Sequence, residues 1–255
     1  MNIKTPTISF CITCKNRIHQ IRQTLPQNLK NNAMSRELIE FVLVDFGSFD
    51  GLREWITQTF QDELKQGYLK YFYTEELPYW HAPIAKNTAH LLASHTILVN
   101  LDCDNYTGNN GGQFVIREFL KQPEKIILHQ FGLVHFDGTF GRISVDRKSF
   151  IEIGGYDESF EPMSMQDEDL IYRLRAHGLK YVVQPDSRYN QAIKNSKAEG
   201  LKYTNTTLTY DEMLDKNRKI SEANLFQGKL VVNPHGWGIR KNIYDWNGNP
   251  VEINL

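Results

Sequence analysis

The sequence predicts an α/β fold with a mostly parallel central sheet flanked by helices. Short apolar runs typical of buried strands alternate with amphipathic segments over the first 120 residues. Several of these runs are followed by a polar cluster, as is common at the carboxyl ends of parallel strands. A chain of 255 residues, 40% of them hydrophobic, can bury one sizeable core. We therefore expect a single domain over residues 1–255, with right-handed crossovers between its strands.

The first half of the chain contains four predicted strands with helices between them. The strands are predicted where apolar residues are most concentrated, over Ile8–Thr13, Ile39–Asp45, Leu69–Tyr73 and His95–Leu101. The helices are predicted from apolar periodicity over Ile18–Asn32, Leu52–Lys65 and Pro83–Ala93. Pro26 should kink or divide the first helix, because proline disrupts a helix interior. Pro83 stands at a helix start, where proline is tolerated.

The second half of the chain has a different pattern. Further strands are predicted over Ile126–His129, Thr139–Val145 and Tyr181–Val183. A short helix is expected from Arg147, and Gln166–His177 is predicted to be an amphipathic helix that ends at Gly178. From Pro185 onward the chain is polar, so residues 186–255 are expected to form an irregular lid or tail.

The charge balance argues against nucleic acid as a partner. The chain carries 29 basic and 30 acidic residues, and no long basic run is interleaved with aromatics. The N-terminus lacks the apolar core of a signal peptide, and no run approaches the roughly 18 apolar residues that a spanning helix needs. We expect a cytoplasmic protein, with peripheral contact to the inner face of a membrane as an option.

The three cysteines, Cys11, Cys14 and Cys103, cannot all pair within one chain. Cys11 and Cys14 have no thioredoxin-like turn between them, and no second pair exists to complete a zinc site. Free thiols in a reducing compartment are the expected state.

Polar clusters follow three of the predicted strands, at residues 13–17, 45–50 and 102–105. In open parallel sheets, ligands bind in the crevice beyond the carboxyl ends of the strands. A single crevice is therefore expected to contain all three clusters.

Asp102 and Asp104 form an Asp-x-Asp triplet directly after a buried strand. Two carboxylates at this place are costly unless something pairs with them. Mg²⁺ and Mn²⁺ prefer carboxylate oxygen and are often held by one or two carboxylates plus substrate phosphates. One interpretation is a divalent metal that neutralises a departing diphosphate, and the other is a solvated turn that caps the strand.

A second acidic group, Asp167-Glu168-Asp169, opens a predicted helix. Acidic residues are favoured in a first helical turn by the helix dipole, which is a purely structural explanation. A carboxylate that faces a crevice from a helix start can also take a proton from an acceptor hydroxyl. Local sequence leaves both interpretations open.

Six segments match the motifs of one enzyme family in the family's order. Over residues 7–185 they are an opening strand with its Asn-Arg turn (8–17), a "VVDDGSxDG"-like element (42–51), an "ARN"-like helix start (85–87), a DxD strand (98–104), a "GGfdE"-like turn (154–158) and an "(E/Q)DxDlxxRl"-like helix (166–174). Together they resemble the family 2 type glycosyltransferases of the GT-A fold. The later segments also resemble the C-terminal half of galactosyltransferase-type and chondroitin-polymerase-type enzymes. Phe46 stands where the family often has a second aspartate.

The resemblance implies a metal-dependent, inverting glycosyltransferase. Its donor would be a nucleoside-diphosphate sugar, with a UDP-sugar as the first choice. Its acceptor would be a hydroxyl of a glycan or lipid-linked molecule, as in polysaccharide biosynthesis. Residues 1–121 would bind the nucleotide, 122–185 would bind the acceptor and carry catalysis, and 186–255 would form the lid.

The resemblance also implies roles for individual residues. Those lining the nucleoside pocket would be Thr13, Asn16, Arg17 and Asp45, with Lys86 and Asn87 near the base or phosphates. Asp102 would contact the ribose or the metal, and Asp104 would ligate the metal, Mn²⁺ or Mg²⁺. Asp167 would be the catalytic base, while Glu168 and Asp169 would hold the acceptor or the helix.

Two residues of the C-terminal segment are further candidates. His235 is a candidate third metal ligand, although imidazole suits Mn²⁺ less well than carboxylate, and an incidental histidine in a surface turn is the alternative. Trp237 is predicted either to stack on a sugar of the acceptor or to anchor the lid.

Two other functions compete with glycosyl transfer. Another Mg²⁺-dependent enzyme, such as a nucleotidyltransferase or a phosphohydrolase, would need a glycine-rich turn or an aspartate pair after the first strand, and Cys14-Lys15-Asn16-Arg17 has neither. A non-catalytic module that binds nucleotide sugars is the second alternative, and such a module need not keep a carboxylate at Asp167.

Overall fold

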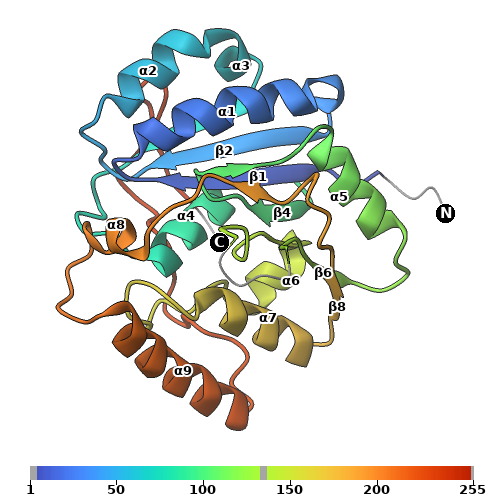
Figure 1. Ribbon diagram of the computed structural model, residues 1–255, viewed down its shortest axis with the longest axis vertical. Coiled ribbons are helices and arrows are strands. Elements are labelled where there is room, and N and C mark those ends of the chain that lie inside the picture. Colours follow the sequence, from blue (N-terminus) through green and yellow to red (C-terminus); the bar gives the residue numbers. More distant parts are fainter. Residues whose placement is uncertain (1–4, 133–136, 254–255) are drawn as a thin grey trace.

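A nine-stranded sheet forms the centre of the molecule, in the order β11-β10-β3-β2-β1-β4-β7-β6-β8. The computed structural model describes residues 5–132 and 137–253. β1 runs parallel to β2 and β4, β2 to β3, and β6 to β8, whereas β7 and β10 each run antiparallel to both of their neighbours. The predicted mostly parallel sheet flanked by helices is therefore confirmed (Figure 1).

The bounds of the elements are as follows. The strands are β1 (Ile8–Cys14), β2 (Ile39–Asp45), β3 (Leu69–Tyr73), β4 (Ile97–Asn100), β5 (Asn105–Tyr106), β6 (Ile126–His129), β7 (Ile143–Asp146), β8 (Lys180–Val183), β9 (Gln191–Ala192), β10 (Ile243–Asp245) and β11 (Pro250–Val251). The helices are α1 (Ile18–Asn32), η1 (Ala33–Ser35), α2 (Leu52–Thr59), α3 (Gln61–Lys65), α4 (Ala82–Leu92), α5 (Gly111–Leu120), α6 (Arg147–Glu152), α7 (Gln166–Ala176), α8 (Lys197–Leu201) and α9 (Tyr210–Phe226).

Successive residues of the central strands face opposite sides of the sheet and supply two separate cores. Phe10 and Leu43 pack in one core with α1, α2 and α5. Cys11 and Val42 pack in the other core with α4, α6 and α7. In Figure 1, α1 and α2 lie on one side of the sheet and α4, α6 and α7 on the other. Both faces of the central strands are therefore covered, which explains why their sequences are almost continuously apolar.

Several predicted elements differ from the observed ones. Pro26 lies inside α1 without dividing it, so of the kink or division expected there, the division is wrong. The predicted helix over 52–65 is instead two helices, because Phe60 leaves the helical conformation (φ -116°, ψ 36°) between them. The strand predicted over Thr139–Val145 is confined to Ile143–Asp146.

The C-terminal segment is more regular than its polarity suggested. The prediction that residues 186–255 are irregular is wrong for α9, which has 17 residues, and for β10, which pairs antiparallel with β3. α9 begins with a capping box in which Thr209 and Glu212 exchange hydrogen bonds. Its buried residues are Met213, Asn217, Ser221 and Asn224. Because three of these four are polar, the helix lacks the apolar stripe on which sequence prediction depends.

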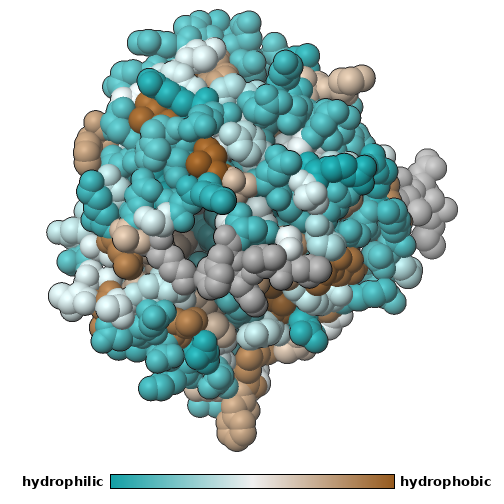
Figure 2. Space-filling model, viewed as in Figure 1, coloured by the Kyte–Doolittle hydropathy of each residue, from teal (hydrophilic) through white to brown (hydrophobic). Residues whose placement is uncertain are grey.

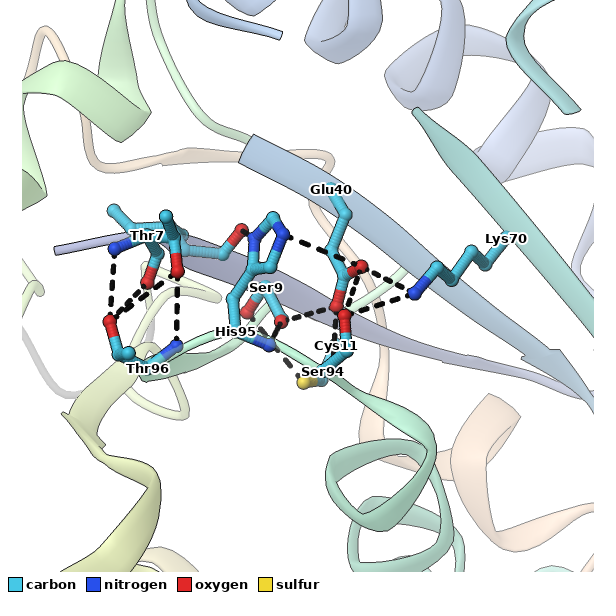
Figure 3. Close-up of polar contacts among 9 residues, drawn as sticks. Thr7, Ser9, Cys11, Glu40, Lys70, Ser94, His95 and Thr96 are labelled. Atoms are coloured by element: carbon cyan, nitrogen blue, oxygen red, sulfur yellow. Dashed lines mark hydrogen bonds and ion pairs between the residues drawn. The ribbon is translucent and has the colours of Figure 1, made fainter. Parts of the chain in front are cut away.

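A polar cluster around Glu40 ties together the amino ends of the central strands (Figure 3). The buried Glu40 carboxylate accepts hydrogen bonds from Ser9 Oγ at 2.6 Å and from the Ser94 backbone N–H at 2.7 Å, and it pairs with Lys70 Nζ at 2.7 Å. These partners come from β1, β3 and the turn after α4. The cluster lies at the opposite end of the sheet from the carboxyl ends of the strands. Its contacts join the strands and the turn after α4 to one another.

No helix in the described part of the chain is both long enough and apolar enough to span a membrane.

Candidate active site

A pocket opens beyond the carboxyl ends of β1 and β4. Its lining comes from both halves of the chain and consists of Thr13, Lys15, Arg17, Trp80, Ala82, Lys86, Asp102, Cys103, Asp104, Gly138, Met163, Gln166, Asp167, Asn195, Gly200 and Tyr203. Six of the residues singled out in the sequence therefore line one pocket: Thr13, Arg17, Lys86, Asp102, Asp104 and Asp167. The molecular face in Figure 2 is mostly hydrophilic and is hollowed near the centre of the view.

Asp102 and Asp104 lie on the turn that follows β4. The Asn105 backbone N–H donates to the Asp102 carbonyl at 2.9 Å, which closes this turn. Asp104 accepts hydrogen bonds from Asn105 Nδ2 at 2.7 Å and from Asn195 Nδ2 at 3.4 Å. Burial, together with the nearby Asp102 carboxylate, raises the pKa of Asp104 to about 6. The turn thus holds two acidic groups in a place that disfavours their combined negative charge, and a cation would relieve this.

Asp167 enters the pocket from the first turn of α7 and is paired with a lysine. Lys86 Nζ, on α4, donates to Asp167 Oδ1 at 2.6 Å, and the two side chains are only 5% and 11% exposed. Burial by itself lowers the pKa of Lys86, but the Asp167 and Asp102 carboxylates outweigh it and raise that pKa. The lysine is therefore protonated. Gln166 Nε2 donates to Asp167 Oδ2 at 3.2 Å.

The pocket's two acidic groups meet at Gly141. A Cβ atom built on this glycine would lie 3.0 Å from Asp102 Oδ2 and 3.3 Å from both Asp167 Oδ2 and Lys86 Nζ. The Gly141 carbonyl accepts a hydrogen bond from Asn100 Nδ2 at 2.9 Å, which fixes the backbone there. The absence of a side chain at this position thus lets the Asp102 turn approach the α4–α7 ion pair.

Basic side chains offset the charge of the acidic groups. Lys15, Arg17 and Lys86 line the pocket together with Asp102, Asp104 and Asp167. Lys15 Nζ donates to the carbonyls of Phe46 and Leu77, so this lysine also braces the loops after β2 and β3.

Arg142 lies fully buried behind the Asp102–Asp104 turn. It donates to Asn105 Oδ1 and to the Tyr106 carbonyl, both at 2.8 Å. Burial lowers the pKa of Arg142 to about 10, although the carboxylates of Asp102 and Asp104 oppose the shift. The guanidinium therefore remains charged near neutral pH and supports the turn from behind.

Within residues 5–132 and 137–253, no three His, Cys, Asp or Glu side chains come together as a metal-binding group. Two carboxylates, Asp102 and Asp104, still line the pocket. Such a pair is adequate for Mg²⁺ or Mn²⁺ when substrate phosphates complete the coordination.

Comparison with known proteins gives relatives of one kind. No family model matches the chain. Validoxylamine A glucosyltransferase of Streptomyces hygroscopicus subsp. jinggangensis is 26% identical over 237 residues, covering 71% of this chain and 54% of that protein. The enzyme of the same name from subsp. limoneus is also 26% identical, with 51% of it covered. The chain thus spans about half the length of the curated relatives it matches.

Two solved structures resemble this one over most of its length. The mannosyltransferase PcManGT of Pyrobaculum calidifontis, in complex with GDP-Man and Mn²⁺, has a TM-score of 0.60 and 15% identity, covering 89% of this chain and 72% of that chain. TarS of S. aureus, in complex with UDP-GlcNAc, has a TM-score of 0.64 and 15% identity, covering 86% and 66%. The fold is GT-A.

Some residues that the family resemblance placed at the site have structural contacts instead. Asp45 is fully buried and accepts hydrogen bonds from Tyr71 Oη at 2.7 Å and the Ser48 backbone at 2.9 Å. Asn87 joins α4 to the loop before α7 through hydrogen bonds with Tyr156 and Glu158. Both residues position parts of the GT-A fold that carry the pocket, and neither lines it.

Asn16 and Asp169 also lie outside the pocket lining. Asn16, at φ 54°, accepts a hydrogen bond from the Phe49 backbone at 2.9 Å and thereby joins the loops after β1 and β2. Asp169 is fully buried, pairs with Arg173 Nε at 2.7 Å and accepts from Ser221 Oγ at 2.7 Å. Glu168 is partly exposed and does not line the pocket, but its charge acts on Lys86.

His235 and Trp237, the two candidates from the C-terminal segment, do not line the pocket. His235 is exposed, in a turn closed by a hydrogen bond from the Gly236 N–H to the Asn233 carbonyl. Trp237 is only 6% exposed and packs edge-on against Phe150, with ring centroids 5.7 Å apart. Of the two roles predicted for Trp237, this burial agrees with anchoring the C-terminal segment.

Several lining residues that the sequence did not predict come from the segment before α9. Asn195, Gly200 and Tyr203 line the pocket, and the Ile193 N–H donates to the Asp104 carbonyl at 2.8 Å. The Trp80 N–H donates to the Tyr203 carbonyl at 2.7 Å. This segment carries no periodic apolar pattern and no motif, so only the folded chain reveals its place in the site.

Proposed function

We propose that this chain is a glycosyltransferase that moves a sugar from a nucleoside-diphosphate sugar to an acceptor hydroxyl. The observation that carries the proposal is that Asp102, Asp104 and Asp167 line one pocket of a GT-A fold, with Asp102 and Asp167 both approaching Gly141. The proposal is also supported by the 26% identity to validoxylamine A glucosyltransferase.

The three acids divide between donor and acceptor. Asp102 and Asp104, with a divalent cation such as Mn²⁺ or Mg²⁺, would hold the diphosphate of the donor. The cation supplies Lewis-acid stabilisation of negative charge on that diphosphate. Arg17 and Lys15, at the end of β1, add fixed positive charge on the same side of the pocket.

Asp167 is the group that would take the acceptor's proton. Its Oδ2 faces Gly141 and the Asp102 turn, while its Oδ1 is occupied by Lys86. A single base opposite the diphosphate is sufficient for in-line, inverting displacement at the anomeric carbon, and no second catalytic carboxylate is needed. A non-catalytic binding module need not keep a carboxylate in this place.

The acceptor would be a hydroxyl of a glycan or of a lipid-linked molecule, and the reaction would serve polysaccharide assembly in the cytoplasm. UDP-GlcNAc and GDP-Man, which occupy the two similar structures, are the first donors to examine.

The most direct experiment is a panel of UDP-, GDP- and dTDP-sugars. Each is screened with and without Mn²⁺ for thermal stabilisation of the protein and for release of the nucleoside diphosphate. We expect at least one donor to stabilise the protein in a metal-dependent way. If no nucleotide sugar binds with metal, the proposed function is wrong.

A pair of isosteric variants then tests the division of roles. Asp104→Asn should lose metal-dependent donor binding, because it removes a hard, charged ligand. Asp167→Asn should still bind the donor but should transfer sugar about a hundredfold or more slowly, because a positioned general base is lost. Equal loss of donor binding in both variants would contradict these assignments.

A further inference from the structure

Lys86 stands between the two halves of the proposed site. Its ammonium is 2.6 Å from Asp167 Oδ1, on the acceptor side, and it also lies beside the Cβ position of Gly141, which Asp102 Oδ2 approaches to 3.0 Å on the donor side. The Tyr156 ring, with its centroid 5.3 Å from Nζ, covers it from another direction. The side chain is almost fully buried, so its charge is little screened by water.

The position of Lys86 gives its ammonium two competing partners once a donor is present. The pocket lining has as many lysine and arginine side chains as aspartates, and the partner bonded to Lys86 is Asp167. A nucleoside-diphosphate sugar adds two further negative charges at the Asp102 side of the pocket. The buried ammonium uses one of its three N–H donors on Asp167, so a phosphate oxygen bonded to another donor would share its charge with that carboxylate and weaken the existing ion pair.

We propose that Lys86 is a positioning residue shared between Asp167 and the donor's diphosphate, so that donor binding loosens its hold on Asp167. This inference rests on the proposed function. Lys86 bonds Oδ1 of Asp167 and holds the carboxylate in place. In the donor-loaded pocket, the diphosphate draws the ammonium away, and Asp167 becomes available to the acceptor hydroxyl. Donor binding therefore weakens the Lys86–Asp167 ion pair, and it must precede the reaction of the acceptor.

The sharing of Lys86 predicts a change in donor affinity that can be measured without any catalysis. If the donor must compete with Asp167 for Lys86, then removing the charge of Asp167 releases the lysine and tightens donor binding. Asp167→Asn is expected to lower the donor Kd by about three- to tenfold, a typical coupling between contacting charged groups. Lys86→Met is expected to raise the Kd by about tenfold, because a charge-assisted bond to phosphate is lost.

The experiment is a double-mutant cycle measured by isothermal titration calorimetry. Wild type, Asp167→Asn, Lys86→Met and the double variant are titrated, in Mn²⁺, with whichever of UDP-glucose, UDP-GlcNAc and GDP-mannose binds the wild type most tightly. The cycle separates release of Lys86 from simple removal of a negative charge. In the first case, the tightening caused by Asp167→Asn disappears in the Lys86→Met background, whereas in the second it persists.

Lys70→Met is the matched control. Lys70 also pairs with a buried carboxylate, Glu40, at 2.7 Å, but at the far end of the sheet (Figure 3). Lys70→Met should lower the melting temperature while leaving the donor Kd within about twofold of wild type.

Each outcome decides the inference. An unchanged or weaker Kd in Asp167→Asn overturns it, as does a tightening that persists in the double variant, and in both cases the proposed function stands. If the wild type binds none of the three donors, the cycle is run with the donor that the wider panel identifies, and if no donor of that panel binds with Mn²⁺, the proposed function and this inference fail together.

Discussion

At the scale of single residues, the site depends on one position that has no side chain. Gly141 allows Asp102, Asp167 and Lys86 to approach a common point at 3.0–3.3 Å. Its backbone is not in the left-handed region, so alanine can adopt the same conformation. Gly141→Ala should therefore fold normally but push the three charged groups apart by a few tenths of an ångström.

We expect Gly141→Ala to lower turnover about ten- to a hundredfold, because small displacements of reacting groups are costly. Steady-state kinetics and a thermal melt on the same sample would check this. A variant with wild-type turnover would show that the convergence at Gly141 has no part in the reaction.

Residue roles were only partly predictable from sequence. Asp102, Asp104 and Asp167 could be singled out because each follows a recognisable strand or opens a helix. The pairing of Lys86 with Asp167 could not, because 81 residues separate them along the chain. Asp45 fits the family motif, yet in this fold its hydrogen bonds go to Tyr71 and Ser48, which no local pattern reveals.

At the scale of elements, α9 supports the side of the pocket that carries Asp167 through buried polar side chains. Asn217 Nδ2 donates to the carbonyls of Met163 at 3.0 Å and Ser164 at 2.9 Å, and Asn217 Oδ1 accepts from the Glu161 N–H at 2.7 Å. Met163 lines the pocket, and Ser164 and Met165 lead into α7 with positive φ angles. α9 therefore fixes the loop from which Asp167 is presented.

Asn217→Ala leaves several backbone groups of this loop without their partner. We expect a loss of about 1–3 kcal/mol in the free energy of unfolding, measured by urea denaturation, together with lower turnover. Lys219→Ala, at an exposed position on the same helix, should change the stability by less than about 0.5 kcal/mol. Equal stability of the two variants would contradict a supporting role for α9.

Some helices and strands could be predicted from the sequence more clearly than others. β2 and β3 were predicted with their observed bounds, because continuous apolar runs have few alternatives in an α/β sheet. α5 was missed because it opens with Asn110-Gly111-Gly112, which looks like a loop. α9 was missed because its inner face is polar, although the capping box at Thr209 and Glu212 was a readable signal.

At the scale of the whole molecule, the sheet separates the pocket from a buried polar cluster at its other end. The carboxyl ends of the strands carry the pocket, and the amino ends carry the Glu40 cluster (Figure 3). Burial alone would raise the pKa of Glu40, but hydrogen bonds from Lys70, Ser9 and Ser94 outweigh it, and the pKa lies below its ordinary value of 4.5. The ionised carboxylate therefore stabilises the fold.

The sign of this shift sets the pH dependence of stability. A carboxylate with a lowered folded-state pKa contributes stability above pH 4.5, and that contribution is lost as the pH falls through the folded-state pKa. Glu40→Gln should be less stable than wild type by about 1–3 kcal/mol at pH 7, and the difference should shrink below pH 4.5. Urea denaturation at pH 7 and below pH 4 measures this, and a difference that stays constant with pH would refute it.

Nucleotide-sugar binding by the Asp102–Asp104 turn is the claim on which the remaining assignments rest. Its most direct test is titration of wild type and Asp104→Asn with the best donor of the panel, each with and without Mn²⁺. We expect saturable binding by wild type that requires Mn²⁺ and is weakened at least about tenfold in Asp104→Asn. Donor binding that is indifferent to both Mn²⁺ and Asp104 would contradict it.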